Sequence, residues 1–184
     1  MDGSDVRQLT DGQRPDYSPI FSADGSEVYF TRDFYGKPKI YVMGADGANP
    51  RAVTNKAGYE LGPALSPDGR TLLFSADRLD GRKMGLDIYS LDVSQPGLEH
   101  YLVARPMHES SVRYSPDGRR IAFVATSDDN PEIYIANADG TGALRLTRDR
   151  ATDGAPTFSA DGKRIIFSSD RDGKYAIYEV DIPG

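Results

Sequence analysis

Short apolar runs, rich in β-branched and aromatic residues, alternate along the whole chain with polar segments that contain Gly and Asp. Residues 28–30, 72–74, 121–123 and 165–167 are such runs, and Gly and Asp bound each of them. This is the sequence pattern of strands. No apolar pattern with a period of 3.6 residues is long enough to indicate a helix. The pattern therefore predicts an all-β fold.

One tetrapeptide, Ser-Pro-Asp-Gly at residues 66–69, divides the chain into repeats. It recurs at 115–118, and with Ala in place of Pro at 22–25 and 159–162, so the four serines lie 44, 49 and 44 residues apart. A nearly fixed period of this length is typical of a repeat architecture. Pro or Ala accepts the φ of a type I turn and Gly adopts a left-handed backbone, so each copy predicts a hairpin turn.

Each repeat contains four predicted strands. The first ends at the Ser-x-Asp-Gly turn, the second carries a Phe, the third carries an Ile-Tyr pair, and the fourth is short. An apolar residue precedes each turn; these residues are Phe21, Leu65, Tyr114 and Phe158. Four positions before each motif Ser stands a small residue, namely Ser18, Gly62, Ser111 and Ala155. We attribute the small size to crowding where the innermost strands of wedge-shaped blades meet.

The two ends of the chain each supply part of one repeat. Residues 6–9 have the pattern of a fourth strand, and residues 155–180 supply three strands without a fourth. Pairing them would close a ring and remove the free sheet edges. We therefore predict a four-bladed β-propeller with four antiparallel strands per blade, closed by the N-terminal strand. We expect a single domain over 1–184, with repeats of approximately 11–54, 55–103, 104–147 and 148–184, the last completed by 1–10.

The repeat resembles the TolB-type, WD-like propeller repeat. The resemblance rests on residues 156–162 (Pro-x-Phe-Ser-Ala-Asp-Gly), on 168–173, on the pair 177–178, and on the Asp-Gly and Leu-Thr dipeptides at 139–140 and 146–147. Such repeats occur in periplasmic TolB, in gating propellers of prolyl-oligopeptidase-like and tricorn-like proteases, and in some lyases. The resemblance thus implies the fold rather than the function. TolB has six such blades and a separate domain, whereas this chain has four.

Composition narrows the classes of partner. The chain of 184 residues has a net charge of -6 and a sequence pI near 4.9, which argues against binding to a nucleic-acid backbone. It lacks an apolar run long enough for membrane insertion, a segment resembling a signal peptide, and any Cys. The resemblance implies a periplasmic location. The start within a predicted turn is consistent with a trimmed or engineered origin.

Four acidic residues occupy equivalent positions, six residues before each motif Ser; they are Asp16, Glu60, Glu109 and Asp153. In a closed ring they would converge at one mouth of an acidic channel, where carboxylates about 8 Å apart repel by about 2 kcal/mol per pair. Such a set would bind Ca²⁺ or another divalent cation, or a basic side chain of a partner. The sequence leaves an alternative to a binding site. In this alternative, each acid fixes a neighbouring loop by accepting hydrogen bonds from backbone N–H groups or by pairing with an Arg.

The loops at the same end form the predicted partner-binding face. It contains acidic and basic loop residues together with aromatic, Met and His side chains, types enriched at interface centres. The predicted residues are Tyr17, Asp33, Tyr35, Tyr59, Asp77, Arg78, Met84, Met107, His108, Asp170 and Arg171. No Gly-x-Ser-x-Gly or His-Glu-x-x-His motif occurs, and we predict no catalytic residue.

These features favour a non-catalytic scaffold that binds a protein or peptide on the loop face around the channel mouth. One alternative is a cation-dependent hydrolase or lyase with its site at that mouth. Another is a fragment, or half of a larger ring that two chains complete as a homodimer. A mass measurement in solution separates the last alternative, because a monomer excludes the half-ring.

Overall fold

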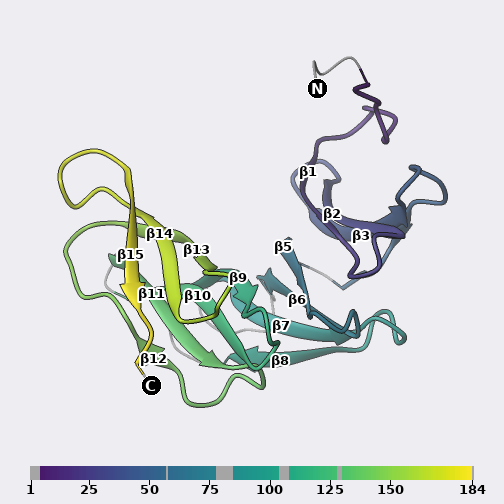
Figure 1. Cartoon of the computed structure of the whole chain (residues 1–184). Coiled ribbons are helices and arrows are strands. Elements are labelled where there is room, and N and C mark those ends of the chain that lie inside the picture. Colours follow the sequence, from purple (N-terminus) through teal and green to yellow (C-terminus); the bar gives the residue numbers. More distant parts are fainter. Residues whose placement is uncertain (1–4, 57, 78–84, 104–107, 128–129, 184) are drawn as a thin grey trace.

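Four antiparallel sheets are arranged as the blades of a four-bladed β-propeller, as predicted (Figure 1). The structure is a computed structural model that describes residues 5–56, 58–77, 85–103, 108–127 and 130–183. All regular elements within these ranges are strands. A helix long and apolar enough to cross a membrane is not found in this part of the chain.

The strands pair in chain order within each blade. Blade 1 contains β1 (Asp16–Phe21), β2 (Glu27–Asp33), β3 (Pro38–Gly44) and β4 (Arg51–Ala52). Blade 2 contains β5 (Glu60–Leu65), β6 (Thr71–Ala76), β7 (Asp87–Asp92) and β8 (Glu99–Val103). Blade 3 contains β9 (His108–Tyr114), β10 (Arg120–Ser127), β11 (Asn130–Asn137) and β12 (Leu144–Arg145). Blade 4 contains β13 (Asp153–Phe158), β14 (Arg164–Ser169) and β15 (Ala176–Asp181).

A Phe of the second strand and a Tyr of the third stand directly opposite each other in every blade. The pairs are Phe30 with Tyr41, Phe74 with Tyr89, Phe123 with Tyr134 and Phe167 with Tyr178. Their ring centroids lie 6.0, 6.1, 5.7 and 6.1 Å apart, and all four Phe side chains are buried. Cross-strand aromatic pairs of this kind hold the register of the two strands.

The hydrophobic core lies between the blades rather than within them. One cluster joins Phe74 of blade 2 to Ile40 of blade 1, and a second joins Phe123 of blade 3 to Ile88 of blade 2. In a third, Phe167 of blade 4 packs with residues of blade 3. Phe74, Phe123 and Phe167 therefore face the preceding blade, and the burial of each of these side chains contributes about 2 kcal/mol.

The Ser-x-Asp-Gly turns also pack from blade to blade. A Cβ added to Gly118 would lie 3.1 Å from Cδ of Pro67 in the preceding turn, and one added to Gly162 would lie 3.8 Å from Cδ of Pro116. At Gly69 the corresponding neighbour is Cβ of Ala23, at 4.0 Å. Gly25, in the first turn, would meet nothing within 4 Å. Successive turns are in contact, but the first turn has no preceding turn against it.

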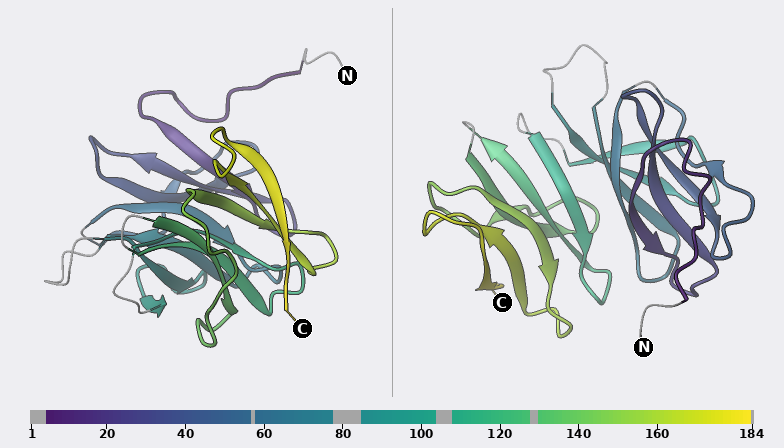
Figure 2. Two further views of the ribbon diagram at one scale, coloured as in Figure 1. Left: turned by 90° about the vertical axis from the view of Figure 1, so that its left-hand side faces the viewer. Right: turned by 90° about the horizontal axis from the view of Figure 1, so that it is seen from above.

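The predicted closing strand is not formed, which corrects this part of the prediction. Residues 5–15 form no strand, and blade 4 has three described strands instead of four. Leu9 instead packs against Val28, Phe30 and Met43 of blade 1, and leaves a cavity of about 190 Å³ beside them. Residues 5–15 lie apart from β15 (Figures 1 and 2). The apolar face of blade 1 holds the N-terminal segment, and this segment does not reach β15.

The position of Leu9 nevertheless follows the repeat. A Cβ added to Gly47 would lie 2.6 Å from the Leu9 carbonyl oxygen, and one added to Gly140 would meet the carbonyl oxygen of Leu102 in β8. Leu9 thus lies against blade 1 as an outer strand of a preceding blade would lie. The alignment of residues 6–9 with fourth strands has this structural counterpart, although the strand pairing is missing.

The small residues of the innermost strands have a different cause from the one we predicted. Ser18, Gly62, Ser111 and Ala155 have φ values of 54°, 62°, 57° and 50°, and each lies where the strand register shifts. A Cβ added to Gly62 would meet nothing within 4 Å, so crowding does not explain its size. Left-handed backbone in a β-bulge favours residues with little or no side chain.

A pair of glycine substitutions tests the packing between turns. Gly118→Ala and Gly25→Ala both place a side chain on left-handed backbone, at φ values of 69° and 73°, which costs about 1 kcal/mol. Only Gly118→Ala also pushes against Pro67, so we expect it to lose about 1 kcal/mol more of the free energy of unfolding. Urea unfolding measures both. Equal losses would contradict the proposed contact.

The turn aspartates make stability depend on pH. Hydrogen bonds from the Ser22 hydroxyl and from Ser26 lower the pKa of Asp24 to about 2 from the ordinary value of 3.8. A lowered pKa in the folded state stabilises the fold above pH 3.8, and this stabilisation is lost as the pH falls toward 2. We expect Ser22→Ala to raise the pKa of Asp24 in an NMR titration. An unchanged pKa would show that Ser22 is not the cause.

Candidate partner-binding face

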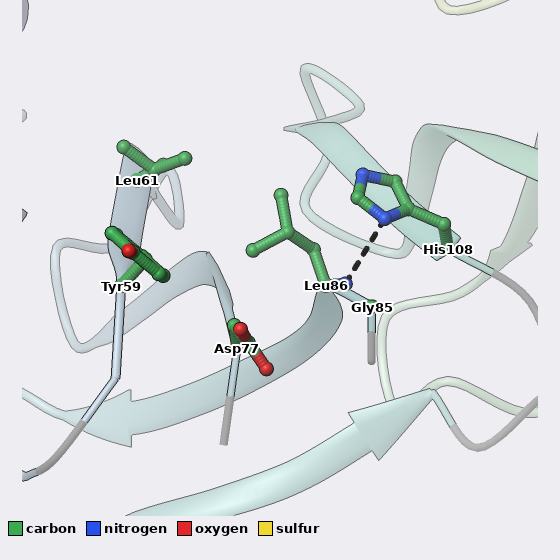
Figure 3. Close-up of a pocket in the computed structure, with 6 residues that line it drawn as sticks. All are labelled: Tyr59, Leu61, Asp77, Gly85, Leu86 and His108. Atoms are coloured by element: carbon green, nitrogen blue, oxygen red, sulfur yellow. Dashed lines mark hydrogen bonds between the residues drawn. The ribbon is translucent and has the colours of Figure 1, made fainter. Parts of the chain in front are cut away.

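The innermost strands β1, β5, β9 and β13 all begin at one end of the propeller, which we call the loop face. A groove of about 390 Å³ opens there between blades 2 and 3 (Figure 3). It is lined by Tyr59, Leu61, Asp77, Gly85, Leu86 and His108. The structure thus brings together three of the predicted partner-binding residues, which are Tyr59, Asp77 and His108.

The backbone of Leu86 joins the two blades beneath the groove. Its N–H donates to Nδ1 of His108 at 3.2 Å, and its carbonyl oxygen accepts the N–H of Glu109 at 2.7 Å. The first bond requires Nδ1 to be unprotonated and sets the orientation of the imidazole ring. Tyr59 is 47% exposed, so its ring is available at the open side of the groove.

The four predicted acids lie at the start of the innermost strands, and three of them have basic neighbours on the second strand, on the third strand or in the turn between these two strands. Arg32 donates to both oxygens of Asp16, at 2.7 and 2.8 Å. Arg171 lies 3.1 and 3.2 Å from the two oxygens of Asp153. Lys39 of blade 1 lies 3.4 Å from Glu60 of blade 2. Glu60 and Glu109 are completely buried, and Asp153 is nearly so.

A basic side chain of the fold therefore balances the negative charge of Asp16, Glu60 and Asp153. Partial burial raises the pKa of Asp16, but the hydrogen bonds from Arg32 and Thr10 and the charge of Arg32 bring the net value below the usual range. Among the described residues, no group of three or more His, Cys, Asp or Glu side chains could hold a metal ion. The divalent-cation site stays a prediction, whereas ion pairs with Arg or Lys account for the geometry of three acids.

The other predicted face residues are distributed over blades 1 and 4. Asp33 accepts the N–H groups of Gly36 and Lys37, at 2.7 and 3.0 Å, and so orders the loop that presents Tyr35. Tyr35 is 92% exposed. Burial and the charge of Asp33 raise the pKa of Tyr17. These contacts place Tyr17, Asp33 and Tyr35 on blade 1, outside the groove.

In blade 4, Asp170 accepts the N–H of Thr152 at 2.8 Å and holds the loop that enters β13. The guanidinium of Arg171 lies 4.6 Å from the ring centroid of Tyr178, as well as beside Asp153. Three further predicted residues, Arg78, Met84 and Met107, lie outside the described residues.

Several residues of this face are missed by sequence reasoning. Leu61 and Leu86 line the groove, and Lys39 links two blades through Glu60 and the Gly58 carbonyl oxygen. Glu132, which is 1% exposed, accepts from the Thr147 hydroxyl and the Asp149 N–H, and also pairs with Arg145. The equivalent positions of the other repeats carry Lys39, Asp87 and Ala176, so the repeat itself gives no signal for Glu132.

Two arginines of blade 4 offer a matched test of these ion pairs. Arg171→Ala leaves the buried carboxylate of Asp153 without its charged partner, so we expect a loss of about 3 kcal/mol in the free energy of unfolding. Arg164→Ala removes a pair with Glu179 in which both side chains are exposed, and should cost less than about 1 kcal/mol. Thermal and urea unfolding measure the difference. Similar losses for both variants would argue against a structural role for Asp153.

Comparison with known proteins places the chain in a family. The family described as "TolB beta propeller domain" matches residues 1–99 and 82–184. The "Protein TolB homolog" of Chlorobium luteolum is 32% identical over 182 residues, which cover 97% of this chain and 38% of that protein. The "Tol-Pal system protein TolB" of Anaeromyxobacter dehalogenans is 29% identical over 162 residues, covering 86% of this chain and 36% of that protein.

A solved structure agrees with these matches. The putative TolB from Agrobacterium tumefaciens superimposes with a TM-score of 0.77 at 27% identity, over 90% of this chain and 61% of that one. The chain thus spans 38% and 36% of the length of the two curated relatives. With the family matched over both halves of the sequence and the same arrangement of blades, the chain belongs to the TolB beta-propeller domain family.

Proposed function

We propose that this chain is a non-catalytic scaffold that binds a protein or peptide on its loop face. The observation that carries the proposal is the groove between blades 2 and 3, which combines an exposed aromatic ring, two Leu side chains and a His. Interfaces concentrate their binding energy in such centres, where an anchor side chain of the partner is surrounded and desolvated.

The chemistry of the groove indicates the kind of side chain it accepts. Leu61, Leu86 and the ring of Tyr59 offer an apolar surface, while Asp77 supplies a carboxylate among the lining side chains (Figure 3). An apolar anchor next to a Lys or Arg of the partner would satisfy both. The net charge of -6 adds a general attraction for a basic partner.

The family supports a protein partner of a particular kind. One relative is named as a Tol-Pal system protein, and we extend this to the present chain as a proposal. The partner is then a component of a Tol-Pal system, and the location is periplasmic. The predicted channel mouth around Asp16, Glu60, Glu109 and Asp153 remains part of this proposal as the centre of the loop face.

Binding of the purified chain to Pal and to the Tol proteins of the same genome tests the proposal. We expect Tyr59→Ala and Leu86→Ala each to weaken binding by about tenfold or more, as for residues at the centre of an interface. Surface plasmon resonance measures the affinities, and circular dichroism confirms that the variants fold.

Leu98→Ala is the matched control. Leu98 is 56% exposed, but it belongs to the turn between β7 and β8, at the opposite end of blade 2 from the groove. This variant should bind as the unchanged chain does. Absence of binding to every Tol-Pal component, or equal affinities for the groove variants and Leu98→Ala, would overturn the proposal.

A further inference from the structure

A second cavity lies at the end of the propeller opposite the loop face. The four innermost strands finish there, and each contributes the apolar residue that precedes its Ser-x-Asp-Gly turn. Phe21, Leu65, Tyr114 and Phe158 thereby surround one hollow of about 300 Å³. Phe21 is 65% exposed, so part of its ring is open to a ligand in the hollow.

Among the described residues that line this cavity, Arg113 is the one that carries a charge. The equivalent positions in the other blades carry Ile20, Ala64 and Thr157, so the charge belongs to one side of an otherwise uncharged wall. Nη1 of Arg113 donates to the Val112 carbonyl oxygen at 2.7 Å. The guanidinium has four further N–H donors, and within the described ranges no carboxylate oxygen lies within 4 Å of it.

The surroundings of Arg113 favour an anionic ligand. Desolvation by the surrounding atoms lowers the pKa of the Arg113 guanidinium, although the residue as a whole is exposed to solvent. A cation that has lost part of its hydration gains more from a bound carboxylate than a fully hydrated one does. A single Arg suits a monoanion, and a carboxylate accepts two parallel N–H bonds from it.

We propose that this cavity binds an apolar carboxylate, with the carboxylate on Arg113 and an aromatic or branched body between the four apolar side chains. The volume is at the lower end of the range for small-ligand pockets, which are mostly apolar with a few polar groups. The ligand is either a free acid or the C-terminal residue of a peptide. Both present the same chemistry to Arg113.

Two matched probes test the proposal on the full chain. We expect N-acetyl-phenylalanine to bind in calorimetry and to shift the NMR signals of the residues around Phe158, and its uncharged amide to bind about tenfold more weakly. A short peptide that ends in Phe, compared with its C-terminal amide, distinguishes the two sources. Stronger binding of the peptide acid than of the free amino-acid derivative indicates a peptide C-terminus.

The variants identify the site. Arg113→Gln should bind the acid and the amide equally, whereas Arg119→Gln, in the exposed turn outside the cavity, should keep the tenfold preference. Phe21→Ala, at a side chain that is already largely exposed, should weaken both probes. The proposal is overturned if the acid and the amide bind the unchanged chain equally, or not at all. It is also overturned if Arg113→Gln keeps the preference while its melting temperature shows it to be folded.

Discussion

Burial of one blade against the next is the interaction on which this structure depends. A four-stranded sheet of this size has two faces, and neither the short strands nor the turns could keep it folded alone. In blades 2 to 4 the Phe of the second strand points at the preceding blade, and the three apolar clusters between blades contain all of the largest buried side chains of these blades. Stability therefore accumulates from neighbour to neighbour along the chain.

The need to bury each blade against a neighbour also explains the outward faces of the first and last blades. Blade 1 presents Val28, Phe30 and Met43 to the side where a preceding blade would pack, and Leu9 covers them. Blade 4 buries Phe167 toward blade 3 but leaves Ile177 73% exposed on its other face. Blade 1 holds the N-terminal segment through these side chains, and the described residues of blades 1 and 4 do not form the fourth interface of a closed ring.

The two ends of the propeller carry different chemistry. The loop face gathers buried carboxylates with basic partners and, between blades 2 and 3, an open groove. The turn end gathers four apolar side chains and Arg113. The innermost strands of six or seven residues separate the two sets by roughly 20 Å, so the two sets do not share a surface.

Much of the fold was predictable because each signal is local and is repeated four times. The Ser-x-Asp-Gly turns, the Phe strands and the Ile-Tyr strands occur in every repeat, and the structure pairs each Phe with its Tyr as the spacing predicted. The repeated position of the four acids also indicated where the innermost strands begin. Tyr59, Asp77 and His108 were predicted for one face because they occupy the loops at that end.

What the repeats cannot encode is how far the blades turn about a common axis, because that angle depends on packing between residues distant in sequence. That angle determined that residues 6–9 lie on blade 1 and not on β15, and that His108 of blade 3 lines one groove with Leu61 and Leu86 of blade 2. The reason for the small residues Ser18, Gly62, Ser111 and Ala155 became clear only from the backbone conformation, because each has a positive φ in a β-bulge. The sequence by itself determined the strands and their order. Only tertiary packing decided which side chains from different blades share a cavity, because a local sequence pattern does not specify contacts between residues that are far apart in the sequence.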